Sequence, residues 1–292
     1  MQPQPSLDLW ADVEQLLAFH FMQNAFAGGT VVAVLSGVVG YFTVTRGQTF
    51  AAHALSQVGF PGAAGAALVG ASPLLGLLAF CAVAALGIAA LAGRPTQNQR
   101  FATAAIGSVL AFALALGFLF ASLYPGFVET VFSVLFGTLI GITDTQVLVL
   151  LIVAAAVLAV MTAIGRPLFF ASVDPDVASA RGVRVRLLAV VFLLVLGLAV
   201  AASASITGTL LVFALLVAPA AAAQQITPRP GLGIVLSVVL ALAVTWLGLS
   251  IAYFSVYPVG FYVTSLGFAV YLIARAVRYG RGFALRRTAV PA

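Results

Sequence analysis

Residues 187–226 read LLAVVFLLVLGLAVAASASITGTLLVFALLVAPAAAAQQI and contain no charged side chain. About 20 apolar residues in a helix cross the hydrocarbon core of a bilayer. The stretch is therefore long enough for two crossings, and the small polar residues at Ser203–Thr207 are suited to a tight turn between them. We predict two membrane-spanning helices here, at 187–206 and 207–226.

The composition of the whole chain supports a membrane protein. Of the 292 residues, 63% are hydrophobic and 7% are charged, whereas soluble domains are about 45–50% apolar and 25% charged. The net charge of +6 comes from arginines in short loops, which is typical of membrane topology and not of nucleic-acid binding. The sequence contains no lysine, so it cannot form a standard Walker nucleotide site, which requires one.

Further apolar runs predict an all-α, polytopic transmembrane helix bundle of eight to nine spans. The Gly-rich run at 50–70 is the weakest candidate. The apolar run at 131–142 is too short to cross, so we expect it to be re-entrant or interfacial. The predicted spans are 24–45, 50–70, 73–93, 102–123, 146–165, 187–206, 207–226, 231–251 and 256–276.

The arginines indicate the orientation of these spans. With the N-terminus outside and the C-terminus cytoplasmic, nine crossings place all 13 arginines on the cytoplasmic side and five of the seven acidic residues on the other, as the positive-inside rule requires. We interpret residues 1–292 as a single transmembrane domain. It has an interfacial N-terminal segment at 1–23, a cytoplasmic loop at 166–186 and a basic cytoplasmic tail at 277–292.

The cytoplasmic loop contains the pattern of a short capped helix. Asp174 suits the N-cap, Pro175 suits the first helical position, and Gly182 suits a position after the C-cap. A helix this short is marginal alone in water. It therefore docks against a partner protein or packs on the inner ends of the spans, and the sequence does not separate these alternatives.

The segment from Arg46 to Gly62 carries the candidate site. His53 and Gln57 lie four residues apart and share a helical face. An ionisable residue in a span is a functional hypothesis by default, although His53 is near enough to the predicted inner end for a structural role. We expect Pro61, Gly62 and, in a later span, Pro219 to break or bend their helices.

Four other residues receive simpler interpretations. We expect the single cysteine, Cys81, to be a packing residue and His20 to be an interfacial histidine. Glu129 and Asp144 are interpreted as solvated carboxylates of outer loops. The alternative for the two acids is attraction of cations or contact with a protein that delivers substrate.

Taken together, these features resemble the membrane permease of ABC importers for divalent metals, the zinc and manganese uptake family. The order and spacing of four segments carry the resemblance. The first is Phe21-Met22-Gln23-Asn24-Ala25, and the second is Arg46 through Gly62, which is similar to the family's Asp-Ala-Leu-Ser-His-x-x-x-Pro-Gly. The third comprises Asp174, Ala178 and Gly182. The fourth is Gly208-Thr209-Leu210-Leu211 followed by Pro219-Ala220.

The resemblance implies a homodimer in the lipid of a bacterial plasma membrane. It also implies a separate cytoplasmic ATP-binding subunit, coupled through Asp174, Ala178 and Gly182, and an extracytoplasmic metal-binding protein. The chain itself is then a non-catalytic subunit with no permanently bound cofactor. Zinc, manganese or iron is the expected substrate, and His53 and Gln57 are expected to line its pathway.

One departure from the family pattern affects the choice of metal. Where the family has Asp followed four residues later by His, this chain has His53 and Gln57. Neutral imidazole is a good zinc ligand and an amide oxygen is a poor one, so His53 is the candidate metal ligand and zinc is the expected ion. The alternatives are a permease for a metal chelate such as haem or a siderophore, and a self-sufficient secondary carrier or channel.

Overall fold

The computed structural model describes residues 18–91, 99–123, 137 and 141–288. The predicted interfacial segment at 1–23 and the predicted re-entrant run at 131–142 lie mostly outside these ranges, as does Glu129. Within the described ranges the regular structure is helical, without strands, which confirms the all-α prediction. The helices are α2 His20–Thr45, α3 Thr49–Leu68, α4 Pro73–Leu91, α5 Gln99–Leu123, α7 Asp144–Val173, α8 Pro175–Ala180, α9 Val185–Thr207, α10 Thr209–Ile226, α11 Pro230–Tyr253 and α12 Val259–Thr288.

Eight of the described helices are long and apolar enough to cross a membrane, and α3 is not among them. The reason lies in its surroundings. Helix α3 packs against α4, α5, α9 and α10, and most of its side chains are buried. A helix enclosed by other helices does not have to present apolar side chains to lipid, so α3 tolerates His53, Ser56 and Gln57. This finding agrees with the predicted count of eight to nine spans.

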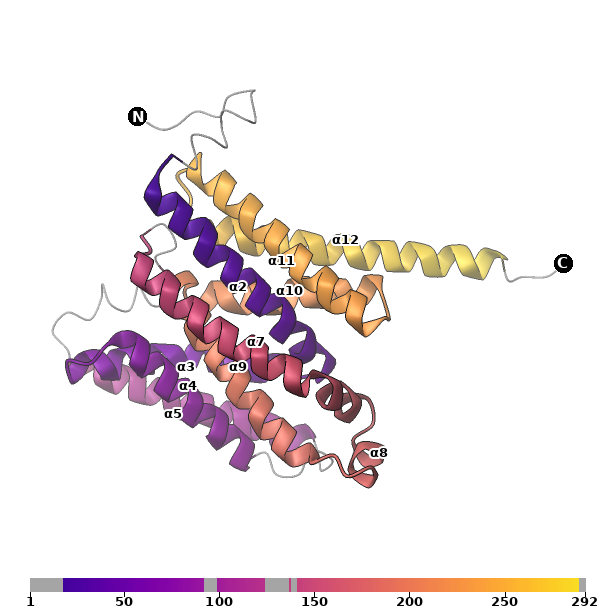
Figure 1. Cartoon of the computed structure of the whole chain (residues 1–292), viewed down its shortest axis with the longest axis horizontal. Coiled ribbons are helices and arrows are strands. Elements are labelled where there is room, and N and C mark those ends of the chain that lie inside the picture. The colour runs from indigo at the N-terminus through magenta and orange to yellow at the C-terminus, as the bar shows by residue number, and fades with distance from the viewer. Residues whose placement is uncertain (1–17, 92–98, 124–136, 138–140, 289–292) are drawn as a thin grey trace.

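The helices form two groups that are joined by α7 and α9 (Figure 1). Helices α3, α4 and α5 pack together on one side, while α2, α10, α11 and α12 pack together on the other. Helix α9 contacts members of both groups, and α7 packs on α2 and α9. His20 contacts Asp144 at one end of the bundle, and Arg46 contacts Ser172 at the other. We call these the His20 end and the α8 end.

Close packing around α2 depends on two glycines. A Cβ atom on Gly37 would lie 2.6 Å from Cα of Val238 in α11, and one on Gly40 would overlap the carbonyl of Leu216 in α10. The missing side chains allow three helix backbones to approach one another, which is the usual way in which helices pack in membranes. Helix α2 is consequently among the most buried spans.

The structure corrects several predicted boundaries. Helix α7 does not end at residue 165 but continues through Pro167 to Val173. The irregular part of the loop predicted at 166–186 therefore begins only at Asp174. Helix α12 continues to Thr288, into the segment that was predicted as a basic tail.

The predicted helix breaks at Pro61, Gly62 and Pro219 do not form, whereas the bend expected at Pro219 stays a prediction. Helices α3 and α10 are continuous through their prolines, because both rings are buried among neighbouring helices, where the lost backbone hydrogen bond is tolerated. Gly62 has a different role. A side chain there would overlap the carbonyl of Gly76, so Gly62 allows α3 and α4 to cross closely.

Candidate functional site

His53 and Gln57 lie on the partly exposed face of α3, whereas the neighbouring positions Ala52, Ala54 and Val58 are buried. The His53 ring packs edge-on against Phe213 of α10, with 4.9 Å between ring centroids and an interplanar angle of 68°. Nδ1 of His53 is buried without a hydrogen-bond partner. The structure thus places both predicted residues side by side, one helical turn apart, next to α10.

The donor set of this face is small. One chain offers an imidazole nitrogen from His53 and an amide oxygen from Gln57, and no group of three His, Cys, Asp or Glu side chains that could hold a metal occurs in the described ranges. A closed structural zinc site has four ligands. A site with two donors is better suited to transient contact with a passing ion than to permanent binding. Conduction requires such transient contact.

The second predicted element, α8, forms as the sequence indicates. Asp174 is its N-cap, and Oδ1 accepts a hydrogen bond of 2.9 Å from the amide of Val177. Pro175 is the first helical residue, and Gly182 has a φ of 83°, in the left-handed region that favours glycine. Ala178 is fully buried, because this side of α8 packs on the chain itself. Val177, in contrast, is 43% exposed, so another side of α8 is open.

Arg46 connects the turn before α3 to the end of α7. Its Nη1 donates a hydrogen bond of 3.0 Å to Oγ of Ser172, and its guanidinium lies 5.4 Å from the centroid of the Phe192 ring of α9. Nε is buried without a partner, and burial lowers the pKa of the guanidinium. Sequence reasoning used Arg46 as a sign of orientation and as the start of the candidate segment, and it did not predict these contacts.

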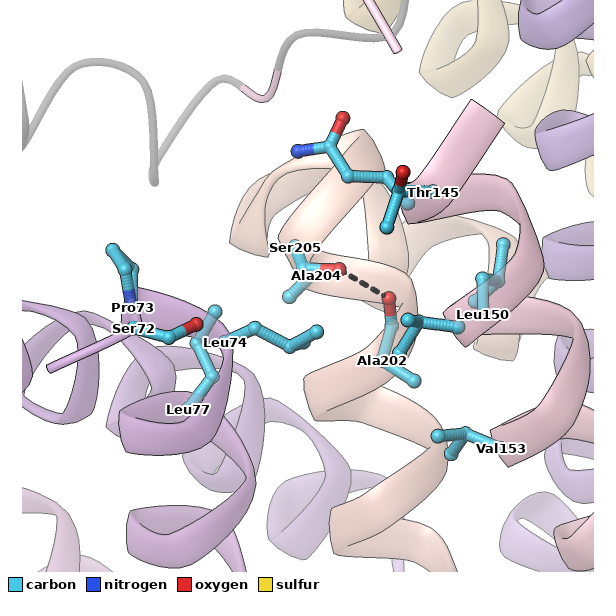
Figure 2. A pocket seen from close by; sticks show the side chains of 12 residues that line it. Ser72, Pro73, Leu74, Leu77, Thr145, Leu150, Val153, Ala202, Ala204 and Ser205 are labelled. Atoms are coloured by element: carbon cyan, nitrogen blue, oxygen red, sulfur yellow. Dashed lines mark hydrogen bonds between the residues drawn. The ribbon is translucent and has the colours of Figure 1, made fainter. Parts of the chain in front are cut away.

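A cavity of about 450 Å³ lies between α4, α7 and α9 near the His20 end (Figure 2). Leu77 of α4 and Leu150 and Val153 of α7 form its apolar part, and the hydroxyls of Ser72 and Ser205 lie at its edge. Its lining contains no imidazole, thiol or carboxylate, and neither His53 nor Gln57 belongs to it.

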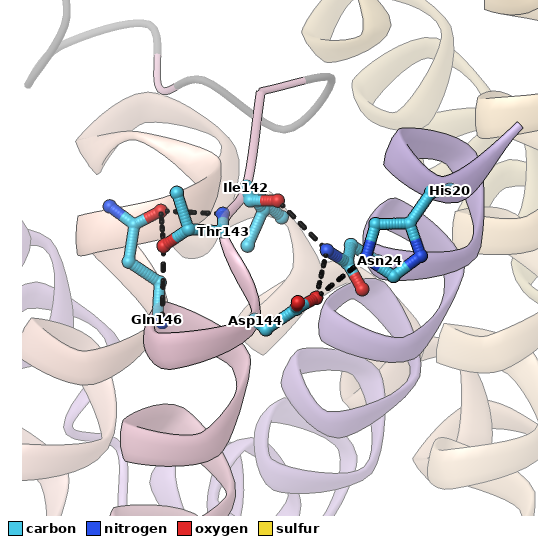
Figure 3. A network of polar contacts seen from close by, with 6 residues as sticks. All are labelled: His20, Asn24, Ile142, Thr143, Asp144 and Gln146. Carbon is cyan, nitrogen blue, oxygen red and sulfur yellow. Dashed lines mark hydrogen bonds and ion pairs between the residues drawn. The ribbon is translucent and has the colours of Figure 1, made fainter.

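A polar network at the His20 end joins the first residues of α2 and α7 (Figure 3). Nε2 of His20 lies 2.9 Å from Oδ1 of Asp144, and Nδ2 of Asn24 donates to the same oxygen at 2.7 Å and to the carbonyl of Ile142 at 3.1 Å. Sequence reasoning considered His20 and Asp144 separately and did not predict their contact. The four-residue spacing of His20 and Asn24 was the available signal.

The comparisons with known proteins cover most of the chain. The model of the ABC 3 transport family matches residues 18–278. The manganese transport system membrane protein MntC of Halalkalibacterium halodurans is 30% identical over 262 residues, which are 89% of this chain and 86% of that protein. The manganese import system permease protein ScaB of Streptococcus gordonii is 29% identical, over 82% of this chain and 85% of that protein.

Two solved structures have similar folds. PsaBC from Streptococcus pneumoniae, in complex with Fab, superposes with a TM-score of 0.80 at 27% identity, over 91% of this chain and 95% of that chain. The second structure is an inward-facing conformation of a putative metal-chelate type ABC transporter. It has a TM-score of 0.68 at 18% identity, over 93% of this chain and 91% of that chain, and it supports the fold alone. On the match to most of its length, the chain belongs to the ABC 3 transport family and is a multi-pass protein of the bacterial plasma membrane.

Proposed function

We propose that the chain is the permease of an ATP-driven importer of divalent metal ions and that zinc is its ion. The observation that carries the assignment as a metal-importer permease is the match, over more than four-fifths of both chains, to proteins named for manganese transport. His53 supports the choice of zinc. Imidazole suits zinc, whereas manganese prefers carboxylate, carbonyl and water oxygens, and no carboxylate accompanies His53 and Gln57 on α3.

The proposed assembly is a homodimer with a cytoplasmic ATP-binding subunit and an extracytoplasmic metal-binding protein. The absence of lysine rules out a standard Walker site in this chain, so ATP is hydrolysed by the separate subunit. Two copies of the α3 face would bring two imidazoles to one pathway. This doubling supplies the donors that a single chain lacks.

In this proposal α8 receives the movement of the ATP-binding subunit. Arginines such as Arg181 and Arg186, near α8, and Arg229, before α11, favour a cytoplasmic location of the α8 end, and the His20 end then faces outward. The N-terminus is accordingly outside, and the C-terminus is cytoplasmic. The exposed Val177 and the side chains around it would form the docking surface.

Manganese is the second candidate ion, because the matched relatives are named for it. A metal chelate such as haem or a siderophore is the third, and free and chelated metal can be compared directly. A secondary carrier that couples transport to protons or sodium would use carboxylates within the membrane. The acidic residues of the described ranges are Asp144, Asp174 and Asp176, all at helix ends, which argues against that mechanism.

Metal content after gene deletion tests the proposal. The gene is deleted in the source bacterium and restored as wild type or His53→Ala, and cell-associated zinc, manganese and iron are measured under metal limitation. Zinc should fall on deletion and recover with the wild type alone, at equal membrane levels of both proteins. A fall in manganese alone would overturn the choice of zinc as the ion. Unchanged levels of all three metals would overturn the assignment as a metal importer. Copurification of an ATP-binding subunit with the chain would argue against a secondary carrier.

A further inference from the structure

The His20–Asn24–Asp144 cluster has the composition of a metal site. His20 and Asn24 extend from successive turns of α2 toward the first residue of α7 (Figure 3). They supply an imidazole nitrogen and a side-chain amide, Asp144 supplies a carboxylate, and the carbonyl of Ile142 faces the same amide. Imidazole, carboxylate and neutral oxygen donors are ligands for first-row divalent cations.

The spacing of these donors fits a coordination sphere. With metal–ligand bonds of about 2.1 Å, neighbouring donors around one ion stand about 3.0–3.4 Å apart. Nε2 of His20 and Oδ1 of Asp144 are already 2.9 Å apart. Asn24 now directs Nδ2 toward two oxygens, at 2.7 and 3.1 Å. A half-turn of the amide exchanges nitrogen for oxygen, so Oδ1 of Asn24 becomes a third donor without a backbone change.

The backbone that carries Asp144 and the Ile142 carbonyl is held firmly. Thr143 and Gln146 form a reciprocal capping box at the start of α7, with contacts of 3.0 and 3.4 Å. The Ile142 side chain is 4% exposed and packs with Ile206 of α9. The donors therefore sit on a fixed frame, which reduces the entropy lost when an ion orders them.

The site is open to water, and none of the arginines that the structure describes competes with a cation there. The side chains of His20 and Asp144 are 72% and 73% exposed. The arginines described by the structure lie in the turns and helix segments of the α8 end, beginning with Arg46. The partners of Asp144 are thus an amide and an imidazole, neither of which carries a permanent positive charge. An exposed pair of this kind contributes little to folding, so its conversion to metal ligation costs little stability.

We propose that His20, Asn24 and Asp144 form a binding site for a first-row divalent cation at the His20 end, separate from the His53–Gln57 face. Binding itself does not depend on the proposed transport function. The role of the site does rest on that function, since in an importer this end receives the ion before it reaches His53. Removal of the site should therefore raise the metal concentration needed for half-maximal uptake.

Equilibrium dialysis of zinc with the purified full-length chain tests binding directly. Wild type, His20→Gln, Asp144→Asn and Asp176→Asn are compared in the same detergent. His20→Gln and Asp144→Asn should each weaken zinc binding at this site about tenfold or more, since even changes in the outer shell of a metal site weaken binding 10- to 100-fold. Asp176 is a carboxylate of the α8 end, so Asp176→Asn should bind zinc like the wild type. Wild-type affinity in both His20→Gln and Asp144→Asn would overturn the proposal.

A variant that binds zinc more tightly than the wild type provides a test that misfolding cannot imitate. Asp144→His places a second imidazole opposite His20 and should tighten zinc binding while it weakens manganese binding. A purely structural His20–Asp144 pair would give no gain, and the absence of one would count against the site. If all variants bind as expected but deletion of the gene changes no cellular metal, the proposed transport function fails and the cation site stands.

Discussion

Nη1 of Arg46 lies 3.0 Å from Oγ of Ser172, so the residue that follows α2 is bound to the last turn of α7. Ser172 is two residues before Asp174, the N-cap of α8. Arg46 is also three residues before Thr49, the first residue of α3. One guanidinium therefore joins the segment that leads into α8 to the turn that leads into the His53 helix.

We expect Arg46→Ala to lower both thermal stability and metal uptake. The change removes a charged hydrogen bond to Ser172 and the contact with the Phe192 ring, and hydrogen bonds of charged groups contribute about 1.5–3 kcal/mol. Arg46→Lys retains the charge but cannot reproduce the planar contact with the ring, so it should recover only part of the loss. Thermal unfolding in detergent and uptake at matched expression give the two measurements.

Arg166 provides the matched control for Arg46. It is an exposed arginine on α7, six residues before Ser172, and Arg166→Ala removes the same charge from the same end of the bundle. Its melting temperature should stay near that of the wild type. Equal effects of the two substitutions would mean that general charge at the α8 end, and not the Arg46–Ser172 contact, is responsible.

Gly40→Ala should be among the most destabilising single-methyl additions in the chain. The new Cβ would overlap the carbonyl of Leu216, a backbone atom that cannot rotate away, so α2 and α10 would have to separate. Inserting a methyl group in a packed core costs about 1–3 kcal/mol or more. Thermal unfolding of the purified protein measures the loss.

Gly107→Ala in α5 is the control for Gly40. Nothing lies within 4 Å of the Cβ position at Gly107, and the residue is inside a regular helix. Alanine there should leave stability unchanged or raise it by about 0.5–1 kcal/mol through its helix propensity. Similar losses at both positions would contradict the close approach of α2 and α10.

The contrast between α8 and α7 shows what the sequence could predict. The cap, first turn and end of α8 depend on Asp174, Pro175 and Gly182, which are local signals, and the structure forms all three. Helix α7 continues past its predicted end because Arg166 and Pro167 interrupt the apolar run without ending the helix, although Pro167 removes one backbone hydrogen bond. The apolar pattern of a sequence locates the stretch of a helix that can lie in the membrane. It does not locate the residue at which the helix ends.

Contacts between distant segments account for the rest of what was missed. His20 and Asp144 are 124 positions apart, and Arg46 and Ser172 are 126 apart. Each pair meets because α2 and α7 pack side by side, which no local pattern specifies. The shared face of His53 and Gln57 could be predicted because one helix carries both at a spacing of one turn.

Asp174→Ala should weaken α8 by about 1 kcal/mol, the usual value of an N-cap. In the proposed importer the weakened helix transmits less movement, so uptake should fall, together with recovery of the ATP-binding subunit when the chain is purified. Asp174→Asn retains a capping oxygen and should behave like the wild type. Asp176 lies in the first turn of the same helix without the capping role, so Asp176→Ala is the control. Equal losses from Asp174→Ala and Asp176→Ala would assign the effect to charge and not to the cap.

Substitutions at His53 and Gln57 should change which metal is carried. Gln57→His places a second imidazole one turn from the first and should favour zinc further, whereas His53→Asp replaces the imidazole with a carboxylate and should shift preference toward manganese. Each predicted change is a change in the ratio of zinc to manganese uptake, measured with both ions present in one assay. The ratio is insensitive to the amount of protein in the membrane, so a folding defect cannot imitate it. Phe213→Leu keeps an apolar neighbour beside His53 and should lower the rate without altering the ratio. If His53→Asp and Gln57→His leave the ratio at its wild-type value, the α3 face does not select the ion, and selection must lie elsewhere along the path.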